Sequence, residues 1–184
     1  MDFPNKKYKL ILADPPWKYK SSNTGRDMKH GANAKYPTME LQDICNLPVP
    51  TISDKDSCLF LWATTPMIQE AFEVMKAWGF KYKTSIYWYK ETNGGLGYWF
   101  RGAVEVCLIG KRGDFKPFRS QQANFISAKS TTHSKKPIEL YTTLEKLNIS
   151  PKIELFARDR RIGWDSWGNQ VPSDCQLYLL QVDA

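Results

Sequence analysis

The chain has 184 residues, of which 42% are hydrophobic, and this length and composition predict one domain over residues 1–184. No apolar run is long enough to cross a bilayer, and the start of the chain lacks an apolar signal-peptide core, so we expect a soluble, cytoplasmic protein. The four cysteines form no CxxC pair and lie apart from both histidines, so we expect neither a metal site nor disulfides.

The net charge of +7 is concentrated in two segments of the chain. Segments 18–35 and 111–136 hold five and seven basic side chains, each against a single aspartate, and both are rich in small polar residues. We interpret them as basic loops on a scaffold that is otherwise slightly acidic. Such loops are typical of a protein with a polyanionic partner, although solvated surface loops would have the same composition.

Short apolar runs bounded by turn residues predict β-strands, and apolar side chains repeating every three to four residues predict helices. In chain order, the expected elements are a strand at 8–13, a short helix at 38–46 capped by Thr38, a strand at 57–63, a helix at 66–78, strands at 81–89 and 103–110, a short strand at 123–128, a helix at 137–147 and a strand at 152–157. This alternation predicts an α/β fold of three layers, with helices on both faces of a mostly parallel sheet.

Two polar side chains directly follow predicted strands. Asp14 comes after the first strand and Arg158 after the last. In folds of this kind, ligands bind at the carboxyl ends of the strands. We therefore expect Asp14 and Arg158 to belong to one site.

The segment Asp14-Pro15-Pro16-Trp17 is the strongest candidate for a catalytic loop. Pro16 has no amide donor, so the Pro15 carbonyl can face outward as an acceptor beside the Asp14 carboxylate, while Trp17 offers a ring face. Two acceptors and a stacking surface suit an amino group on a flat heteroaromatic ring. Accepting both N–H hydrogens localises the nitrogen lone pair for attack on a methyl sulfonium. The alternative is a proline-rich turn with a packed tryptophan.

Five motifs occur in order between Tyr8 and Gln170: DPPW, YPTM, GYWFRGAVEVCLIGKRG, HSKKP and IELFARDRRIGWDSWGNQ. Together they resemble the DPPW-type adenine N6-methyltransferases, the family of the catalytic subunit of the eukaryotic mRNA adenosine methyltransferase, which also has compact bacterial and phage members. The resemblance implies a Rossmann-like class I methyltransferase fold in which the catalytic strand precedes the cofactor strand. It also implies S-adenosyl-L-methionine as the methyl donor.

The resemblance assigns the target adenine to the catalytic loop, Asp14, Pro15, Pro16 and Trp17, with Tyr36 lining the same pocket or merely packing in its loop. Asp14 would also lie against the cofactor. Lys136 would bind the methionine carboxylate, which suits an ammonium group placed just ahead of a helix N-terminus.

On the cofactor side, the resemblance implies that Phe156 packs against the cofactor, that Arg158 and Arg160 contact its ribose, and that Asn169 and Gln170 close over it. The two arginines could instead bind nucleic-acid phosphate. No GxGxxG loop is present, as expected for a cofactor without phosphate. For Glu154, the alternative to cofactor contact is an ion pair with Arg101 or a lysine.

On the substrate side, residues 99–102 and Glu105 match a family segment. Arg101 is the candidate there, whereas the aromatic pair Trp99 and Phe100 is more typical of a core than of a base-stacking surface. We also expect the basic loops to contact the polymer. Their assigned side chains are Lys18, Lys20, Lys111, Arg112, Lys116 and Arg119.

The favoured function is methylation of the N6 amino group of adenine in DNA, on a single strand or a flipped-out base, by a bacterial or phage-type enzyme in the cytoplasm. An RNA N6-adenosine methyltransferase is the alternative, because basic loops do not separate DNA from RNA. A non-catalytic nucleic-acid-binding subunit is disfavoured by the intact Asp14. Methylation of cytosine or protein glutamine is disfavoured because related enzymes for those substrates vary the aspartate and the tryptophan. We expect a monomer or a weak homodimer.

Overall fold

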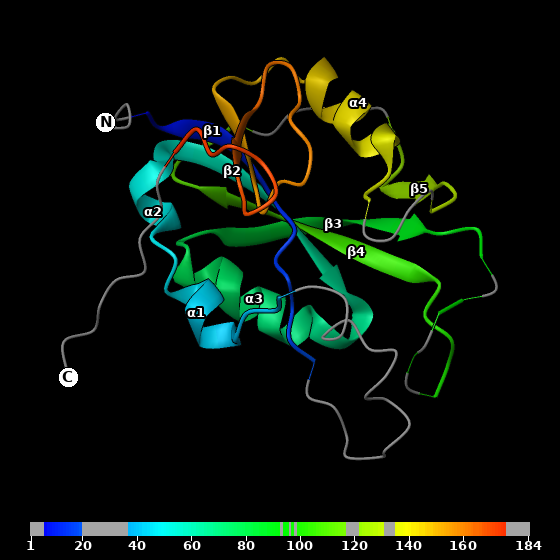
Figure 1. The fold of residues 1–184 in the computed structure, drawn as a ribbon. Coiled ribbons are helices and arrows are strands. Elements are labelled where there is room, and N and C mark those ends of the chain that lie inside the picture. The colour runs from blue at the N-terminus through cyan, green and yellow to red at the C-terminus, as the bar shows by residue number, and fades with distance from the viewer. Residues whose placement is uncertain are drawn as a thin grey trace.

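In a computed structural model, the protein is described over residues 6–19, 37–92, 94, 95, 97, 99–116, 122–130 and 135–175. The strands form one seven-stranded sheet in the order β5-β3-β4-β2-β1-β6-β7 (Figure 1). Their bounds are β1 Tyr8–Ala13, β2 Ser53–Thr64, β3 Lys81–Tyr89, β4 Val104–Arg112, β5 Phe125–Ser127, β6 Lys152–Leu155 and β7 Asp165–Trp167. The helices are α1 Leu41–Cys45, α2 Val49–Ile52, α3 Ile68–Ala77 and α4 Ile138–Lys146, with a 3-10 turn, η3 Thr65–Met67, before α3.

The sheet is parallel except for β4, which runs antiparallel to both neighbours, β2 and β3. β4 is reversed because it follows β3 through the segment 90–103, which lacks the crossover helix that a parallel connection needs. Strands β1, β2, β3 and β6 therefore all end at one edge of the sheet, here called the carboxyl edge. The prediction of a mostly parallel α/β sheet is confirmed. The strand predicted to lead into the Asp-Pro-Pro-Trp loop, β1, pairs directly with β6.

Helices lie on both faces of the sheet and make three layers (Figure 1), and apolar side chains fill the space between the layers. On one face, Ile11 and Leu59 pack with Ile44 of α1 and with Ala71 and Val74 of α3. On the other face, the buried partners come from β1, β2 and α4, and they are Leu10, Leu12, Phe60, Leu140 and Leu144. Because side chains alternate along a strand, the unbroken apolar runs of β1 and β2 serve both cores.

Several predicted element bounds differ from the observed ones. Helix α1 is shorter than 38–46 and begins after Glu40, whose side chain makes no capping hydrogen bond, so Thr38 is not the cap. The short elements α2 and β7 were not predicted, because four and three residues are too few to show a period. Gly79, with φ of 80°, ends α3 as expected.

Two general expectations concern membranes and metals. Within the described residues, no helix is long and apolar enough to cross a membrane. The same part of the chain contains no group of three His, Cys, Asp or Glu side chains placed to hold a metal ion.

Candidate active site

Asp14 is the first residue after β1 and lies at the carboxyl edge. Its Oδ1 is 2.8 Å from Nζ of Lys136, which comes two residues before α4. Both side chains are largely buried. The segment that leads into α4 therefore brings a cation to the end of the central strand, which joins two of the motifs separated by more than a hundred residues in the chain.

The contact between Asp14 and Lys136 continues into a row of alternating charges. Nζ of Lys136 lies 3.0 Å from Oε2 of Glu105, in β4. Nζ of Lys90, the residue after β3, lies 2.5 Å from Oε1 of the same glutamate. We call Lys90, Glu105, Lys136 and Asp14 the ion ladder. Lys136 also makes a cation–π contact, because its Nζ lies 5.4 Å from the ring centroid of Trp62.

The ion ladder changes the proton affinity of its members. Burial raises the pKa of Asp14 above its ordinary value, and the nearby Lys136 and Arg158 offset only part of that rise. Burial alone would lower the pKa of Lys136, but the carboxylates of Asp14 and Glu105 outweigh it and raise the pKa. For Glu105, the two lysines overcome the effect of burial and lower the pKa. Lys136 thus stays charged, while Asp14 is a stronger base than an exposed aspartate.

The catalytic loop is held by backbone contacts. The Trp17 amide donates to the Pro15 carbonyl at 2.9 Å, and the Met39 amide donates to the Pro16 carbonyl at 2.9 Å. The Pro15 carbonyl is therefore already used once, although a carbonyl oxygen has a second lone pair. The loop is anchored to the segment that leads into α1 and has a defined shape.

Trp17 is packed into the core instead of presenting an open ring face. Only 5% of its surface is exposed, and its indole N–H donates to the Trp62 carbonyl at 3.1 Å. The structure thus favours the packed-tryptophan alternative for this side chain. The physical reason is that the indole can bury its rings and satisfy its N–H only by reaching a carbonyl of β2.

The end of β6 forms the wall opposite the catalytic loop. Phe156 has φ of 61°, a backbone conformation that redirects the chain after the strand, and its half-buried ring packs edge-on against Trp167 at 5.3 Å. The Ala157 amide donates to the Trp167 carbonyl at 3.0 Å. Gly168 approaches so closely that a Cβ there would lie 2.4 Å from the Ala157 oxygen. Phe156 therefore has a fixed position beside β7.

The two arginines predicted to contact the cofactor have different surroundings in the structure. Arg158 follows β6 at the carboxyl edge, beside the end of β1, and its charge acts to lower the pKa of Asp14. Arg160 is exposed and forms an ion pair with Asp174 at 2.6 Å. Asp174 also accepts a hydrogen bond from the Ser166 amide, so Arg160 is tied to the β7 segment. Asn169 and Gln170, both exposed, follow β7 at the same edge of the sheet.

Within the described residues, Glu154 pairs with a tyrosine. The Tyr141 hydroxyl of α4 donates to its Oε1 at 2.7 Å, and Arg161 lies 3.7 Å from the Tyr141 ring centroid. The alternative of an ion pair with Arg101 or a lysine is not seen among the described residues, and cofactor contact stays a prediction. Burial raises the pKa of Glu154, and the Tyr141 hydrogen bond offsets part of the rise.

The predicted substrate residues that the structure describes lie in separate places. Lys18, beside the catalytic loop, is exposed and pairs with Glu40. Arg101 is exposed on the connection between β3 and β4. Lys20, Tyr36 and Arg119 lie outside the described residues.

Lys111 and Arg112 are part of β4 and not of a loop. Glu105 pairs with Thr64 at the carboxyl edge, whereas Arg112 pairs with Ser57 at the other end, so the two lie about 23 Å apart along the strand. Arg112 donates to the Pro50 carbonyl at 3.0 Å, and Lys116 follows β4 at the same end. Because β4 runs antiparallel to its neighbours, these three side chains lie at the end of the sheet away from Asp14, and their contact with the polymer stays a prediction.

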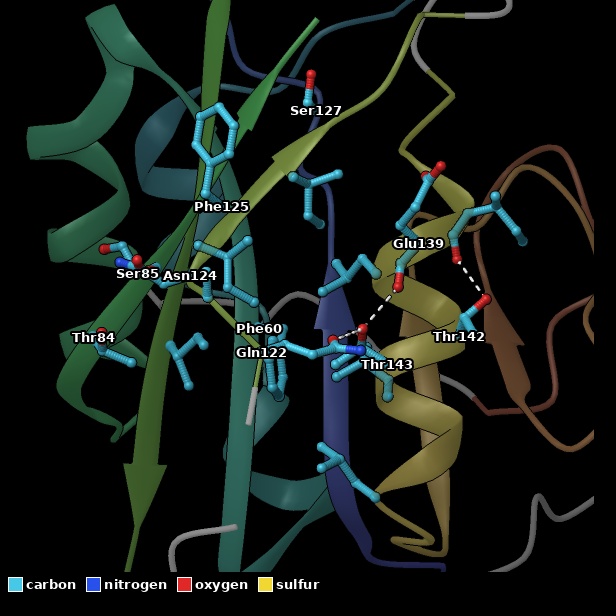
Figure 2. Close-up of a pocket in the computed structure, with 18 residues that line it drawn as sticks. Phe60, Thr84, Ser85, Gln122, Asn124, Phe125, Ser127, Glu139, Thr142 and Thr143 are labelled. Atoms are coloured by element: carbon cyan, nitrogen blue, oxygen red, sulfur yellow. Dashed lines mark hydrogen bonds between the residues drawn. The ribbon is translucent and has the colours of Figure 1, made fainter. Parts of the chain in front are cut away.

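A cavity of about 560 Å³ lies elsewhere, between α4 and the outer strands (Figure 2). Figure 2 shows Glu139, Thr142 and Thr143 of α4 along one side of it, across from Phe125 and Asn124. Thr143 donates to Gln122 Oε1 at 2.7 Å across the gap. Its lining includes neither Asp14 nor any residue of the ion ladder, so it is separate from the candidate active site.

Comparisons with known proteins agree with this geometry. The MT-A70 family matches residues 8–170, a span that includes the catalytic loop, the ion ladder and the end of β6. The chain belongs to the MT-A70 methyltransferase family. It is 34% identical to the Type II methyltransferase M.MunI of Mycoplasma sp, over 93% of this chain and 81% of that protein.

The same MT-A70 domain is present in much longer eukaryotic proteins. Human N(6)-adenosine-methyltransferase catalytic subunit METTL3 is 29% identical over 97% of this chain, which spans only 30% of METTL3. The N(6)-adenosine-methyltransferase MT-A70-like protein of Arabidopsis thaliana is 31% identical over 88% of this chain and 23% of its own length. The likeness to these proteins is therefore confined to one part of each.

Methyltransferases of the MT-A70 family use S-adenosyl-L-methionine, and the residues at the carboxyl edge fit that cofactor. The ammonium of Lys136 suits the methionine carboxylate, and Asp14 suits a positively charged group beside it. The half-buried ring of Phe156 offers an apolar wall, and the Arg158 guanidinium offers hydrogen-bond donors to ribose hydroxyls. The donor set matches a cofactor with a charged amino-acid end and a neutral nucleoside end.

Sequence reasoning missed three parts of the candidate active site: Lys90, the pairing of Glu105 with two lysines, and Trp62. The signal that could have revealed Glu105 is a charged residue inside the apolar run of β4, since a buried carboxylate needs a cationic partner. No local pattern identified the partner, because Lys90 and Lys136 reach Glu105 from two other segments.

Proposed function

We propose that this chain transfers a methyl group from S-adenosyl-L-methionine to the N6 amino group of adenine in DNA. The observation that carries the proposal is the buried Asp14 carboxylate, which ends β1 in the Asp-Pro-Pro-Trp loop and lies 2.8 Å from Lys136. It supplies an acceptor of raised pKa next to a group suited to the cofactor. Family membership supports the reaction class.

In this proposal, S-adenosyl-L-methionine supplies an electrophilic methyl group on a sulfonium that departs as a neutral thioether. Asp14 accepts one N–H of the adenine amino group, and the second lone pair of the Pro15 carbonyl accepts the other. The lone pair of the nitrogen, no longer shared fully with the ring, forms the new N–C bond. The surplus proton leaves the nitrogen for Asp14, whose raised pKa suits it to that task.

Lys136 has two tasks in the proposed mechanism. Its contact with Asp14 orients the carboxylate toward the site, and its ammonium binds the carboxylate end of the cofactor. Glu105 holds Lys136 from the other side and acts as a positioning residue. Phe156, Arg158, Asn169 and Gln170 would line the rest of the cofactor site, and Asp174 keeps Arg160 out of it.

We assign the polymer as DNA from the extent of the similarities. The chain spans 81% of a compact type II methyltransferase but only 30% of METTL3. The competing assignment is RNA, and the names of the eukaryotic relatives as N(6)-adenosine-methyltransferases support it.

The test is transfer of tritium from labelled S-adenosyl-L-methionine to matched single-stranded DNA, duplex DNA and RNA, followed by digestion and identification of the nucleoside. We expect labelled N6-methyldeoxyadenosine. Label in N6-methyladenosine only would move the assignment to RNA. Label in cytosine or in protein, or in none of these, would overturn the adenine assignment.

A further inference from the structure

The connection between β3 and β4 displays two large aromatic side chains to solvent. We call residues 90–103 the hairpin, which extends from the sheet at the right of Figure 1. Trp99 is 99% exposed and Phe100 is 85% exposed. Among the other described aromatic residues, the most exposed is Phe125 at 55%. Two large apolar rings in contact with water are unfavourable in free energy, and a binding partner that covered them would remove this cost.

The described part of the hairpin is built so that these rings point outward. Gly95 donates to the Gly102 carbonyl at 2.9 Å, which closes the two arms on each other. A Cβ at Gly97 would lie 2.3 Å from the Phe100 carbonyl oxygen, and one at Gly94 would lie 2.7 Å from the Arg101 Cβ. Only glycine fits at these two positions. The backbone atoms of the two arms fill the space between them, so the large side chains of the hairpin extend into solvent.

The hairpin also adjoins the proposed catalytic centre. It begins at Lys90, the first member of the ion ladder, and each contact from there through Glu105 and Lys136 to Asp14 is 3.0 Å or shorter. The hairpin thus rises from the carboxyl edge of the sheet, where β1 also ends at Asp14.

Two exposed cations lie on the hairpin and at its base. Arg101 directly follows Phe100 and is exposed. The Ala128 amide donates to the Tyr89 carbonyl at 3.1 Å, which brings the exposed Lys129 to the base of the hairpin. The acidic residue at this base, Glu91, accepts a hydrogen bond from Ser127. Aromatic rings beside cations are the combination that holds unpaired nucleic acid.

We infer that Trp99 and Phe100 form a stacking platform for unpaired bases next to the target adenine, so that the substrate is a single strand or a locally opened duplex. This inference rests on the proposed function. The reason for an unpaired strand is that stacking on a ring needs the face of a base, and in a duplex both faces are covered by neighbouring base pairs. Arg101 and Lys129 contact the phosphates of the same strand.

The experiment compares three full-length variants with the native chain. Trp99→Ala with Phe100→Ala removes the platform, and Trp99→Phe with Phe100→Tyr keeps two rings. Tyr82→Ala removes a half-exposed ring from the other end of β3 and is the matched control. Binding of a short fluorescein-labelled DNA single strand, and of its duplex, is measured by anisotropy at one salt concentration, because phosphate contacts depend on salt.

We expect the double alanine variant to lose about tenfold in single-strand affinity for each ring removed, with little change for the duplex. The two-ring variant and Tyr82→Ala should bind as the native chain does, and calorimetry should give unchanged binding of S-adenosyl-L-methionine to all three. Unchanged single-strand affinity of the double alanine variant, or an equal loss in Tyr82→Ala, would overturn the inference. So would sedimentation showing that the rings hold two copies of the chain together while strand affinity stays the same.

The inference and the proposed function fail in different ways. If the double alanine variant methylates adenine with an unchanged KM for the strand, the platform is wrong and the proposed function stands. If no adenine is methylated by the native chain, but single-strand binding still depends on the two rings, the proposed function is wrong and the platform stands.

Discussion

The two ends of the sheet use basic side chains in different ways. At the carboxyl edge, Lys90 and Lys136 alternate with Glu105 and Asp14 in largely buried contacts. At the opposite end, Arg112 donates to the neutral Pro50 carbonyl. A buried charge costs several kcal/mol of desolvation unless its partners are well placed, whereas a cation near solvent costs little. In this protein, a basic residue belongs to the candidate active site where the fold places buried carboxylates beside it, as it does for Lys90 and Lys136.

The largest effect should follow from Asp14→Ala. It removes the acceptor of the adenine amino group but leaves Lys136 paired with Glu105. We expect methyl transfer to fall by about a hundred- to a thousandfold, the size of effect seen when one preorganised polar group is lost from an active site. Cofactor binding, measured by calorimetry, should fall far less than methyl transfer, because Lys136 remains to bind the carboxylate end of the cofactor. Asp14→Asn, of equal size, is the control for shape, and full turnover in either variant would contradict the role of the loop.

The next prediction concerns the contribution of the ion ladder to stability, which should depend on the negative charge of Glu105 between the two lysines. Glu105→Gln leaves Lys90 and Lys136 facing each other across a neutral amide, and we expect a loss of about 3 kcal/mol in the free energy of unfolding. Urea denaturation measures it. Lys111→Gln, at the far end of the same strand, should change stability by less than about 0.5 kcal/mol. Equal losses in the two variants would show that the two ends of the sheet do not differ.

Lys136→Ala should weaken binding of S-adenosyl-L-methionine by about ten- to a hundredfold, as expected for the loss of one charge-assisted hydrogen bond. Titration calorimetry gives the affinity. Lys135→Ala is the matched control, because its side chain pairs with Asp159 at the surface. If both variants bind the cofactor as tightly as the native chain, Lys136 does not bind the cofactor and its role is limited to orienting Asp14.

The pH dependence of transfer tests the basicity of Asp14. Because burial raises the pKa of this carboxyl, the rate at saturating cofactor should fall, as the pH is lowered, at a higher pH than an exposed aspartate would give. Lys136 acts to lower that pKa, so Lys136→Met should move the acid limb to still higher pH. Single-turnover rates across the pH range measure the limb. An unmoved limb would show that another group titrates.

The smallest effect should come from Arg160→Ala. Since Asp174 already pairs with this guanidinium, we expect cofactor affinity to change less than about twofold, within the range of a surface ion pair. Arg158→Ala, two residues away and close to Asp14, should weaken binding more. Titration calorimetry on the two variants measures their cofactor affinities. A larger loss in Arg160→Ala than in Arg158→Ala would assign the ribose contact to Arg160.

Local patterns in the sequence determined much of this protein. The apolar runs of β1, β2, β4 and β6 and the helical spacing of α3 and α4 predicted these elements to within a few residues, because burial forces a period that is visible locally. The chain also determined that Asp14 would end a central strand and that Lys136 would precede a helix. The glycine at position 79 marked the end of α3.

Only the tertiary structure decided which of these residues meet. The reversal of β4 carried Glu105 to the carboxyl edge and Lys111 and Arg112 to the other end. Packing between strands buried Trp17 against Trp62, while the glycine-rich hairpin left Trp99 in solvent. The physical reason is the same throughout: burial and ion pairing depend on neighbours from distant segments, and strand order and direction, which no local period encodes, choose those neighbours.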